Sequence, residues 1–471
     1  KVLDLLIHLY WIEKKEPMST SSKTDSNSIK KFTYYNIVNF PEEKEGKAPT
    51  STIPKSLLQD FLKILGREIL KEDEPKLEDI EQELKNLKNE KENKISESQS
   101  NEIKSISKQS SIIAELQQLG YIKDSRKWLS KKGFFAVGAR LLEDVVRALN
   151  MGTIGLHETN SSGNGSLNLD STKKYELSDD LRLINVPRSL LNAIERRSGS
   201  KLPIQLPIEF QTDDLEIYET KKDVSIAIVY CIDLSSTMRY STMFGDMSRI
   251  EAAKKALWSL FLLNQKFFPS DTIYVVGFGA LASKVSPYDI PYLKTFESGV
   301  GFMHYTNYQA AFRLAKKILQ NETTINKKIV LITDGHPSAC FIDTEQERSK
   351  IISERPYSQF YVPDGESVNL VKEKQDLSLD TKSGKLVYLC YRYRQVDQYI
   401  GEKTILEAKK CHKSGIDIDT IMVSEEVSLL SYVNELEKYV KGRSYYINPA
   451  EIDKILITDY LNDKKSILKP K

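Results

Sequence analysis

Two short apolar runs, each ending in polar residues, stand out in the hydrophobic pattern of the chain. The first, SIAIVYCI, occupies residues 225–232, and the second, KKIVLITDG, ends at Gly335. Both are rich in β-branched residues, and both are too short to span a membrane. This pattern predicts strands that are buried on both faces, as in a parallel sheet.

Helical periodicity alternates with such runs from residue 225 onward. Alternation of this kind predicts an α/β fold with a doubly wound, Rossmann-like parallel sheet. Residues 336–401 are too long for an ordinary connection and hold alternating aromatic segments, which predicts a hairpin insertion. We expect strands at 225–233, 272–279, 329–333, 417–423 and 444–447, and helices at 246–267, 306–320, 403–414, 425–440 and 449–461.

The chain before residue 222 is predicted to be mainly helical. A periodic helix covers 54–70, and the charged stretch 71–108 fits a solvated helix that runs into a disordered linker better than a short coiled coil. Two further helices follow, separated by turns at Gly120 and Gly133, and Pro187 begins another. The Gly/Ser/Asn-rich residues 151–175 are expected to form a loop. The predicted regions are 1–108 (helical and partly disordered), 109–222 (small helical region and linker), 223–462 (the sheet domain with insertion 336–401) and 463–471 (tail).

Composition narrows the possible classes of partner and compartment. The net charge is +2, so no basic excess favours nucleic acid. Four scattered cysteines form no disulfide framework, and no transmembrane run is present, so we expect a reducing, cytoplasmic location without membrane contact. The sequence starts with Lys1 rather than Met, so residues including a signal can precede it.

Oxygen-bearing side chains gather where the two apolar runs end. Asp233, Ser235, Ser236 and Thr237 follow the first run, and Asp334 follows the second. Carboxylates and hydroxyls are good ligands for a hard cation such as Mg²⁺ or Mn²⁺. The ends of parallel strands are also where open α/β sheets usually bind ligands. Strand-end turns and helix caps use the same residue types, so each motif alone would favour a purely structural role.

The pattern Asp233-x-Ser235-x-Thr237, followed by Thr306 and Asp334, resembles the metal-ion-dependent adhesion site of von Willebrand factor A (VWA) domains. The resemblance implies that the three hydroxyls contact the ion and that both aspartates bind it directly or through water. It also implies one open position for an acidic group of a protein partner. Thr237 replaces the usual serine, and His304 and Tyr305 precede Thr306 where glycine is often found.

Further stretches resemble one branch of the VWA family. LSKKG, LINVPRSLLNAI, ITDGHP and GRSYYI are similar to cytoplasmic bacterial and archaeal VWA proteins that work beside MoxR-type AAA+ ATPases. This resemblance implies an adaptor or substrate-recognition subunit, with the ATPase as a separate chain because no phosphate-binding P-loop motif is present. The alternatives are an accessory VWA subunit of a magnesium-chelatase-like enzyme and an extracellular adhesin with a missing signal.

Other chemistry is less consistent with the sequence. His304 and His336 flank the predicted ligands, but oxygen-only neighbours favour a role at the rim over zinc or iron ligation. Ser235, Asp334 and His336 form a conceivable hydrolytic trio, yet the chain lacks a G-x-S-x-G nucleophile motif. Gly277-Phe-Gly279-Ala-Leu-Ala282 lacks the helix that a dinucleotide site needs. We therefore expect a binding protein and not an enzyme.

Overall fold

The computed structural model divides the chain into two compact units, which we describe separately. The larger unit consists of residues 3–153 and 226–459, and the smaller one contains residues 154–225 and 460–471. The predicted boundary at 222/223 therefore differs from the structural divisions, which fall at 153/154 and 225/226. The structure describes residues 54–72, 77–95, 111–148, 162–176, 184–199, 210–221, 225–241, 247–298, 301–384, 386–390, 396–423, 432, 438, 442–446 and 449–468.

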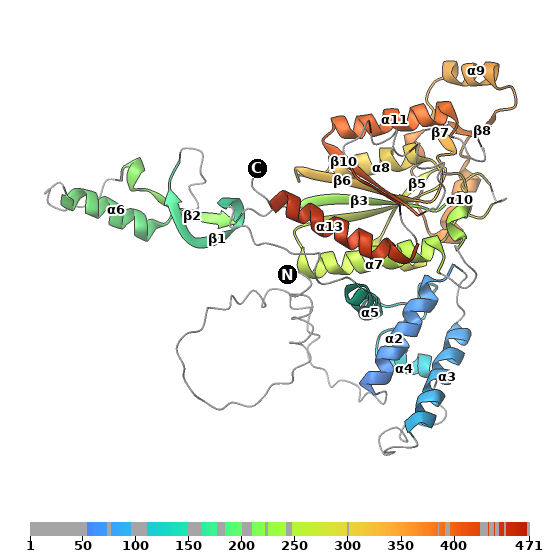
Figure 1. Cartoon of the computed structure of the whole chain (residues 1–471), viewed down its shortest axis with the longest axis horizontal. Coiled ribbons are helices and arrows are strands. Elements are labelled where there is room, and N and C mark those ends of the chain that lie inside the picture. The colour runs from blue at the N-terminus through green and yellow to red at the C-terminus, as the bar shows by residue number, and fades with distance from the viewer. Residues whose placement is uncertain are drawn as a thin grey trace. The chain divides into compact units, whose positions relative to one another are not determined.

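A six-stranded sheet forms the centre of the larger unit, and it confirms the predicted doubly wound fold (Figure 1). All neighbouring strands are parallel except β5, an edge strand that the sequence analysis did not predict and that pairs antiparallel with β4. Every residue of the central strand β3 is buried. The spatial order is β11 (Ser444–Tyr446), β10 (Ile416–Met422), β6 (Asn326–Thr333), β3 (Ile226–Asp233), β4 (Thr272–Phe278) and β5 (Ala282–Val285).

The register of the central strands brings their ends together. Cys231 lies beside Leu331 of β6 and beside Val276 of β4. Ile232 pairs with Ile332, so β3 and β6 end at the same level of the sheet. Residues that follow these two strands therefore emerge at one edge, as expected for parallel neighbours.

Helices cover both faces of the sheet. Helices α8 (Tyr308–Gln320) and α11 (Gln398–Lys413) lie on one side and α7 (Arg249–Phe267) on the other (Figure 1). Helix α7 begins three residues later than predicted because Ser248 caps it. The Ser248 hydroxyl accepts from the Glu251 amide at 3.3 Å, and the Glu251 carboxylate accepts from the Ser248 amide at 3.1 Å.

Four amino-terminal helices belong to the same unit: α2 (Lys55–Leu70), α3 (Leu77–Ile95), α4 (Ile112–Gln118) and α5 (Lys131–Ala148). Helices α5 and α2 pack against α7, and α3 packs against α2 and α4. Phe134 of α5 stacks on Trp258 of α7, with ring centroids 4.9 Å apart. Gly138 permits this close approach, since a Cβ there would lie 2.3 Å from a methyl of Leu262. Gly133 was predicted in the preceding turn but lies in the first turn of α5.

The insertion forms a small sheet of its own in place of the predicted hairpin. Strand β9 (Leu386–Leu389) pairs antiparallel with β7 (Ala339–Ile342) on one side and β8 (Gln359–Tyr361) on the other. Helices α9 (Glu345–Glu354) and α10 (Gly365–Gln375) connect these strands. A buried cluster closes one face of this sheet: Cys340, Ile342, Ile351, Tyr388 and Ile400.

The smaller unit contains a strand where the sequence predicted a loop. Residues expected to be a loop include β1 (Ser162–Lys174), which pairs antiparallel with β2 (Glu216–Lys221). Pairing with β2 supplies backbone hydrogen bonds that the Gly/Ser/Asn-rich sequence does not reveal. Helix α6 (Val186–Gly199), predicted around Pro187, is confirmed, and its Arg196 forms a 2.8 Å ion pair with Asp214.

The carboxyl-terminal segment also departs from expectation. Helix α13 (Ile452–Leu468) extends past its predicted end at 461, so most of the predicted tail 463–471 is helical. It runs from the larger unit into the smaller one. The predicted helix 425–440 lies almost entirely outside the described residues. Among the described helices, none is long and apolar enough to cross a membrane.

Candidate functional site

Two buried carboxylates lie where β3 and β6 end. Asp233 is the last residue of β3, and Asp334 directly follows β6. Asp233 is fully buried and accepts hydrogen bonds from the Ser235 amide at 2.8 Å and from the Thr333 hydroxyl at 2.6 Å. The register of the two strands thus brings together aspartates that are about one hundred residues apart in sequence.

Two hydroxyls extend this oxygen cluster from Asp233 to Asp334. Ser235 Oγ and Thr237 Oγ1 share a hydrogen bond of 3.1 Å, and Thr237 Oγ1 donates to Asp334 Oδ1 at 2.9 Å. Ser235 is buried, whereas Thr237 is exposed at the surface. Hydrogen bonds therefore join four of the five predicted ligands, all except Thr306. Of these four, Thr237 faces solvent.

Arg249, which the sequence analysis did not single out, completes the charge balance of the cluster. It is the first residue of α7, and its guanidinium donates to Asp334 Oδ2 in an ion pair. The side chain of Arg249 is 20% exposed and that of Asp334 only 1%. A cation therefore already lies against one of the two carboxylates, as expected for a buried charge.

Burial makes the ionised forms of both aspartates unfavourable. Desolvation, with a further contribution from the negative charge of Asp334, raises the pKa of Asp233 to about 7. Desolvation also raises the pKa of Asp334, although the Arg249 charge acts in the opposite direction. Two buried like charges of this kind favour a cation that would lie between them.

Thr306 lies on a loop that hydrogen bonds hold against Ser338 and Ala339, at the start of β7. Its carbonyl accepts from the amides of Ser338 and Ala339, and its amide donates to Ser338 Oγ at 3.0 Å. Gly279 permits the loop to pass closely, because a Cβ there would lie 2.1 Å from the Met303 carbonyl oxygen. Among the described residues, no hydrogen bond joins the Thr306 hydroxyl to the other four predicted ligands.

Tyr308 and Thr333 hold the site residues in place through hydrogen bonds, and neither was predicted from the sequence. Tyr308 is fully buried, and its hydroxyl donates to the Gly335 carbonyl at 2.5 Å and to Thr333 Oγ1 at 3.3 Å. Thr333 in turn holds Asp233. The position of Thr333 beside Asp334 was a usable signal, since a hydroxyl at a buried strand end needs a partner.

The two histidines lie in the loops beside the oxygen cluster. His304 is partly buried, which lowers the pKa of its imidazole, and its Nδ1 has no hydrogen-bond partner. His336 contacts the Tyr432 ring edge-on, with centroids 6.3 Å apart. The hydrogen bonds described above join Asp233, Ser235 and Asp334 to Thr237, Thr333 and Arg249, so they give no support to the zinc site or to the hydrolytic trio.

The insertion lies beside the loop that carries Thr306. Tyr361 of β8 stacks on Phe302 with ring centroids 3.7 Å apart. A cavity of about 410 Å³ opens between this loop and α10, and its walls include Arg239, Met303 and Leu370. The insertion thus contributes to the surface around the oxygen cluster.

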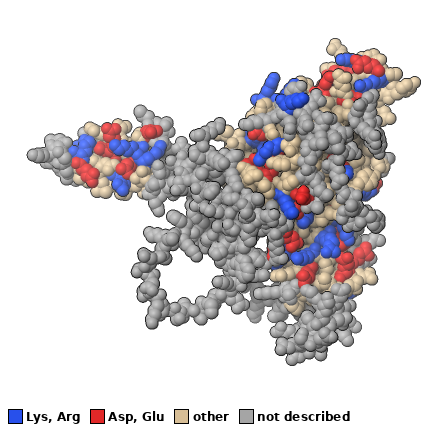
Figure 2. Space-filling model, in the orientation of Figure 1, with Lys and Arg blue, Asp and Glu red and all other residues tan. Residues whose placement is uncertain are grey.

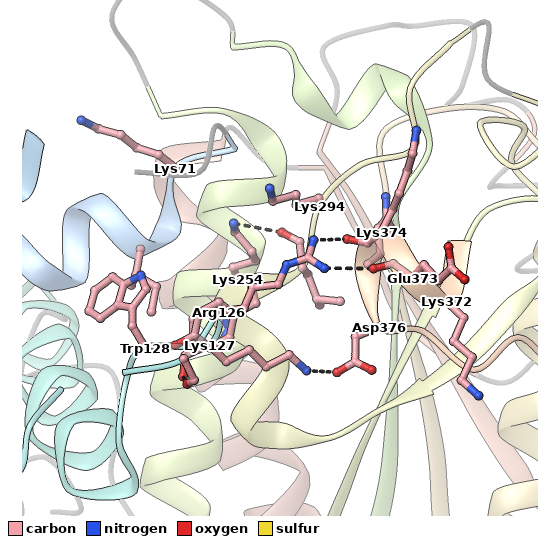
Figure 3. Close-up of a pocket in the computed structure, with 16 residues that line it drawn as sticks. Lys71, Arg126, Lys127, Trp128, Lys254, Lys294, Lys372, Glu373, Lys374 and Asp376 are labelled. Carbon is pink, nitrogen blue, oxygen red and sulfur yellow. Dashed lines mark hydrogen bonds and ion pairs between the residues drawn. The ribbon is translucent and has the colours of Figure 1, made fainter. Parts of the chain in front are cut away.

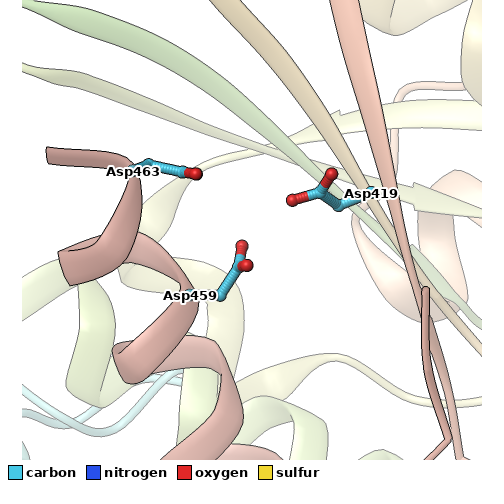
Figure 4. Close-up of side chains that lie close together, drawn as sticks. All are labelled: Asp419, Asp459 and Asp463. Atoms are coloured by element: carbon cyan, nitrogen blue, oxygen red, sulfur yellow. The ribbon is translucent and has the colours of Figure 1, made fainter. Parts of the chain in front are cut away.

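Asp419 of β10 and Asp459 of α13 form a second pair of buried carboxylates (Figure 4). Lys328 forms ion pairs with both, and Arg443 lies 3.3 Å from Asp419 and 2.9 Å from Asp459. Tyr445 also donates to Asp459. These cations account for the pair without any bound ion.

Residues 226–359 match a family model described as "Rv0959-like protein, vWA domain", and residues 168–220 match "Rv0959-like protein, third domain". The chain therefore contains a VWA domain, as the sequence pattern predicted.

Relatives with 24% identity over 234 residues include the uncharacterized proteins Rv0959 of Mycobacterium tuberculosis and Mb0984 of Mycobacterium bovis. The match covers 50% of this chain and 32% of each relative. The chain thus spans about a third of the length of these curated relatives.

Solved structures with a similar fold include a mutant of the PilB minor pilin from Streptococcus sanguinis, at 16% identity and a TM-score of 0.38. That match covers 55% of this chain and 67% of the pilin. The vWF domain of the pilus tip protein Mfa5 from Porphyromonas gingivalis matches at 16% identity and a TM-score of 0.36, covering 53% of this chain and 98% of that one. TM-scores this low carry no argument about function.

Proposed function

We propose that this chain is a metal-dependent protein-binding module. Asp233, Ser235, Thr237, Thr306 and Asp334 would hold Mg²⁺ or Mn²⁺, and an Asp or Glu of a protein partner would complete the coordination. The observation that supports this most is the chain of hydrogen bonds from Asp233 through the Ser235 amide, and on through the Ser235 and Thr237 hydroxyls, to Asp334. A divalent ion would supply the positive charge and the open coordination position that a partner carboxylate needs.

The donor set fits such an ion in chemistry. All five side chains offer oxygen, which magnesium and manganese prefer, and the two carboxylates would provide the negative charge. Thr237 is the exposed member, so it marks the side from which a partner would approach. Arg249 would have to release Asp334, and its side chain, which is 20% exposed, already reaches solvent in part.

The proposed partner is a MoxR-type AAA+ ATPase system in the cytoplasm, with this chain as the adaptor or substrate-recognition subunit. The proposal includes no catalytic reaction, no nucleic acid and no membrane contact. It rests on the sequence resemblance of the VWA branch and on the absence of a P-loop from the chain. An accessory role in a magnesium-chelatase-like enzyme remains the alternative, and chelatase subunits among the captured partners would favour it.

The test is capture of partners from a bacterial lysate by the immobilised chain, in Mg²⁺ and in EDTA. We expect a AAA+ ATPase, or a protein that binds one, to be retained in Mg²⁺ and released by EDTA. Asp334→Asn should lose these partners even in Mg²⁺, whereas Asp343→Asn, an aspartate on the insertion, should retain them. Equal retention in both buffers, together with no heat of Mg²⁺ binding in calorimetry, would refute the proposal.

A further inference from the structure

A second cavity lies between α7 and the end of α10, and it shares Arg126 and Lys294 with the cavity beside the Thr306 loop. Its volume is about 420 Å³, within the range of small-molecule sites. Five segments that are distant in sequence form its walls: Ile69 and Lys71, residues 125–128, Lys254 of α7, residues 291–294 and residues 372–376. All of them belong to the larger unit.

The walls of this cavity are strongly basic. Seven lysines and arginines line it, against the two carboxylates of Glu373 and Asp376. Figure 3 shows Arg126, Lys254 and Lys294 close together near its centre, whereas Lys71 extends away from it. Elsewhere, the surface visible in Figure 2 intersperses both signs of charge, and the net charge of the chain is only +2. The gathering of cations is therefore local.

Lys254 is the buried member of this group. It is 1% exposed, and its ammonium donates to the Leu293 carbonyl at 3.1 Å. In the described part of the chain, no carboxylate lies within ion-pair distance of its Nζ. The charges of Glu72 and Glu251 favour its ammonium from farther away, but burial and the charge of Lys294 act against it, and its pKa is lowered to about 8. A buried ammonium is costly unless an anion compensates it.

Contacts of Arg126 and Lys127 fix one wall of the cavity. The Arg126 guanidinium donates to the carbonyls of Glu373 and Lys374 at the end of α10, at 2.9 Å for Glu373. Lys127 joins Asp289 at 2.8 Å and also pairs with Asp376. These bonds fix the loop at 125–128 to the insertion, so the cations around the cavity are positioned before any ligand arrives.

We propose that this cavity binds a small molecule that carries two or more phosphate groups, with Lys254, Lys294 and Arg126 as its cationic contacts. Phosphate oxygens present several acceptors and a dense negative charge, which match lysines and an arginine that converge from separate elements. An acidic peptide would spread its carboxylates over a longer surface, so it fits a group of three central cations less well. The inference does not depend on the proposed metal site.

The test is titration calorimetry of the metal-free protein with sodium tripolyphosphate, and with inorganic phosphate as the smaller probe. We expect one tripolyphosphate per chain and at least about tenfold weaker binding of phosphate. Lys254→Met should lower the tripolyphosphate affinity at least about tenfold. Lys294→Gln should have the same effect, and it serves as the second test if Lys254→Met does not fold. Lys266→Met, in the last turn of the same helix, should remain within about twofold of the parent.

Three results would overturn the proposal. They are the absence of binding at millimolar tripolyphosphate, an equal loss in Lys266→Met and Lys254→Met, and tighter binding of hexaglutamate than of tripolyphosphate. Asp334→Asn should leave tripolyphosphate binding unchanged. The two proposals can therefore fail independently.

Discussion

Thr237 is the residue at which the metal hypothesis can be tested with the least disturbance. Its side chain is exposed, and its hydroxyl contacts both Ser235 and Asp334. Thr237→Ser keeps the hydroxyl, whereas Thr237→Val keeps only the shape. We expect Mg²⁺ affinity within about threefold of the parent for serine and at least about tenfold weaker for valine, about 1.4 kcal/mol, by calorimetry. Equal affinities would mean that Thr237 packs and does not bind the ion.

We expect that the negative charge of Asp233, a proposed metal ligand, lowers the stability of the metal-free protein. Its pKa is raised to about 7 by burial and by Asp334, so its charge is unfavourable in metal-free protein. Asp233→Asn removes that charge and keeps an oxygen for the Ser235 amide. In EDTA at pH 8 we expect a free energy of unfolding equal to or above that of the parent, with Mg²⁺ binding lost.

A denaturant melt in EDTA measures the stability of the Asp233 variant. Asp271→Asn is the matched control, since Asp271 is also buried and accepts from the Ile226 amide at 3.1 Å. The control should keep its Mg²⁺ affinity. A loss of more than about 2 kcal/mol in Asp233→Asn would instead make Asp233 a structural residue.

The buried Lys254 should make the free energy of unfolding depend on pH. Burial, together with the charge of Lys294, lowers its pKa from 10.5 to about 8, while Glu72 and Glu251 act in the opposite direction. Between pH 8 and 10.5 the unfolded chain therefore binds more protons at this residue, so its contribution to stability rises with pH. Lys254→Met should remove that rise and stabilise the protein at pH 7 by on the order of 2 to 3 kcal/mol.

Denaturant melts of the parent and Lys254→Met at pH 7 and pH 10 measure both effects. The difference between the two proteins should shrink at the higher pH. A difference that is the same at both pH values would show that the Lys254 ammonium is not disfavoured by burial. The Lys266→Met variant controls for the loss of one positive charge.

At the scale of the elements, two helix caps of the same kind should have different consequences. Ser248 caps α7, whose side chains are mostly buried, and Thr344 caps α9, in which only Ile351 is buried. Ser248→Ala should lower the global free energy of unfolding by about 1 kcal/mol. Thr344→Ala should leave it nearly unchanged and speed hydrogen exchange only in α9. Equal global losses would mean that α9 unfolds together with the sheet.

The elements also show what the sequence could and could not predict. The strands β3 and β6 were predictable because burial on both faces requires continuous apolar residues. β1 was not, because its polar residues form a strand only through pairing with β2. In the site, Asp233 and Asp334 carried a recognisable spacing, but the role of Arg249 depends on where α7 begins and on its side-chain direction. Such contacts cannot be read from local patterns.

At the scale of the whole molecule, a bound ion should stabilise one unit only. The five proposed ligands all belong to the larger unit. Mass action predicts about 2.7 kcal/mol of stabilisation at a Mg²⁺ concentration one hundred times the dissociation constant. Scanning calorimetry in Mg²⁺ and in EDTA should show an upward shift in the unfolding of the larger unit, and no shift in Asp233→Asn. A parent protein whose melting is the same in both buffers would contradict the metal site.

The small sheet of the insertion has a consequence for the speed of folding. β10 pairs with β6, although residues 334–415 separate them in the chain. Closing so long a loop is entropically costly, and the cost grows with its length. The insertion shortens the loop by folding on itself: β7 pairs with β9, and the Cys390 amide donates to the Ser338 carbonyl at 2.9 Å. An insertion that folds early would therefore shorten the effective loop between β6 and β10 and bring the two strands together. Loosening it should slow refolding much more than it speeds unfolding.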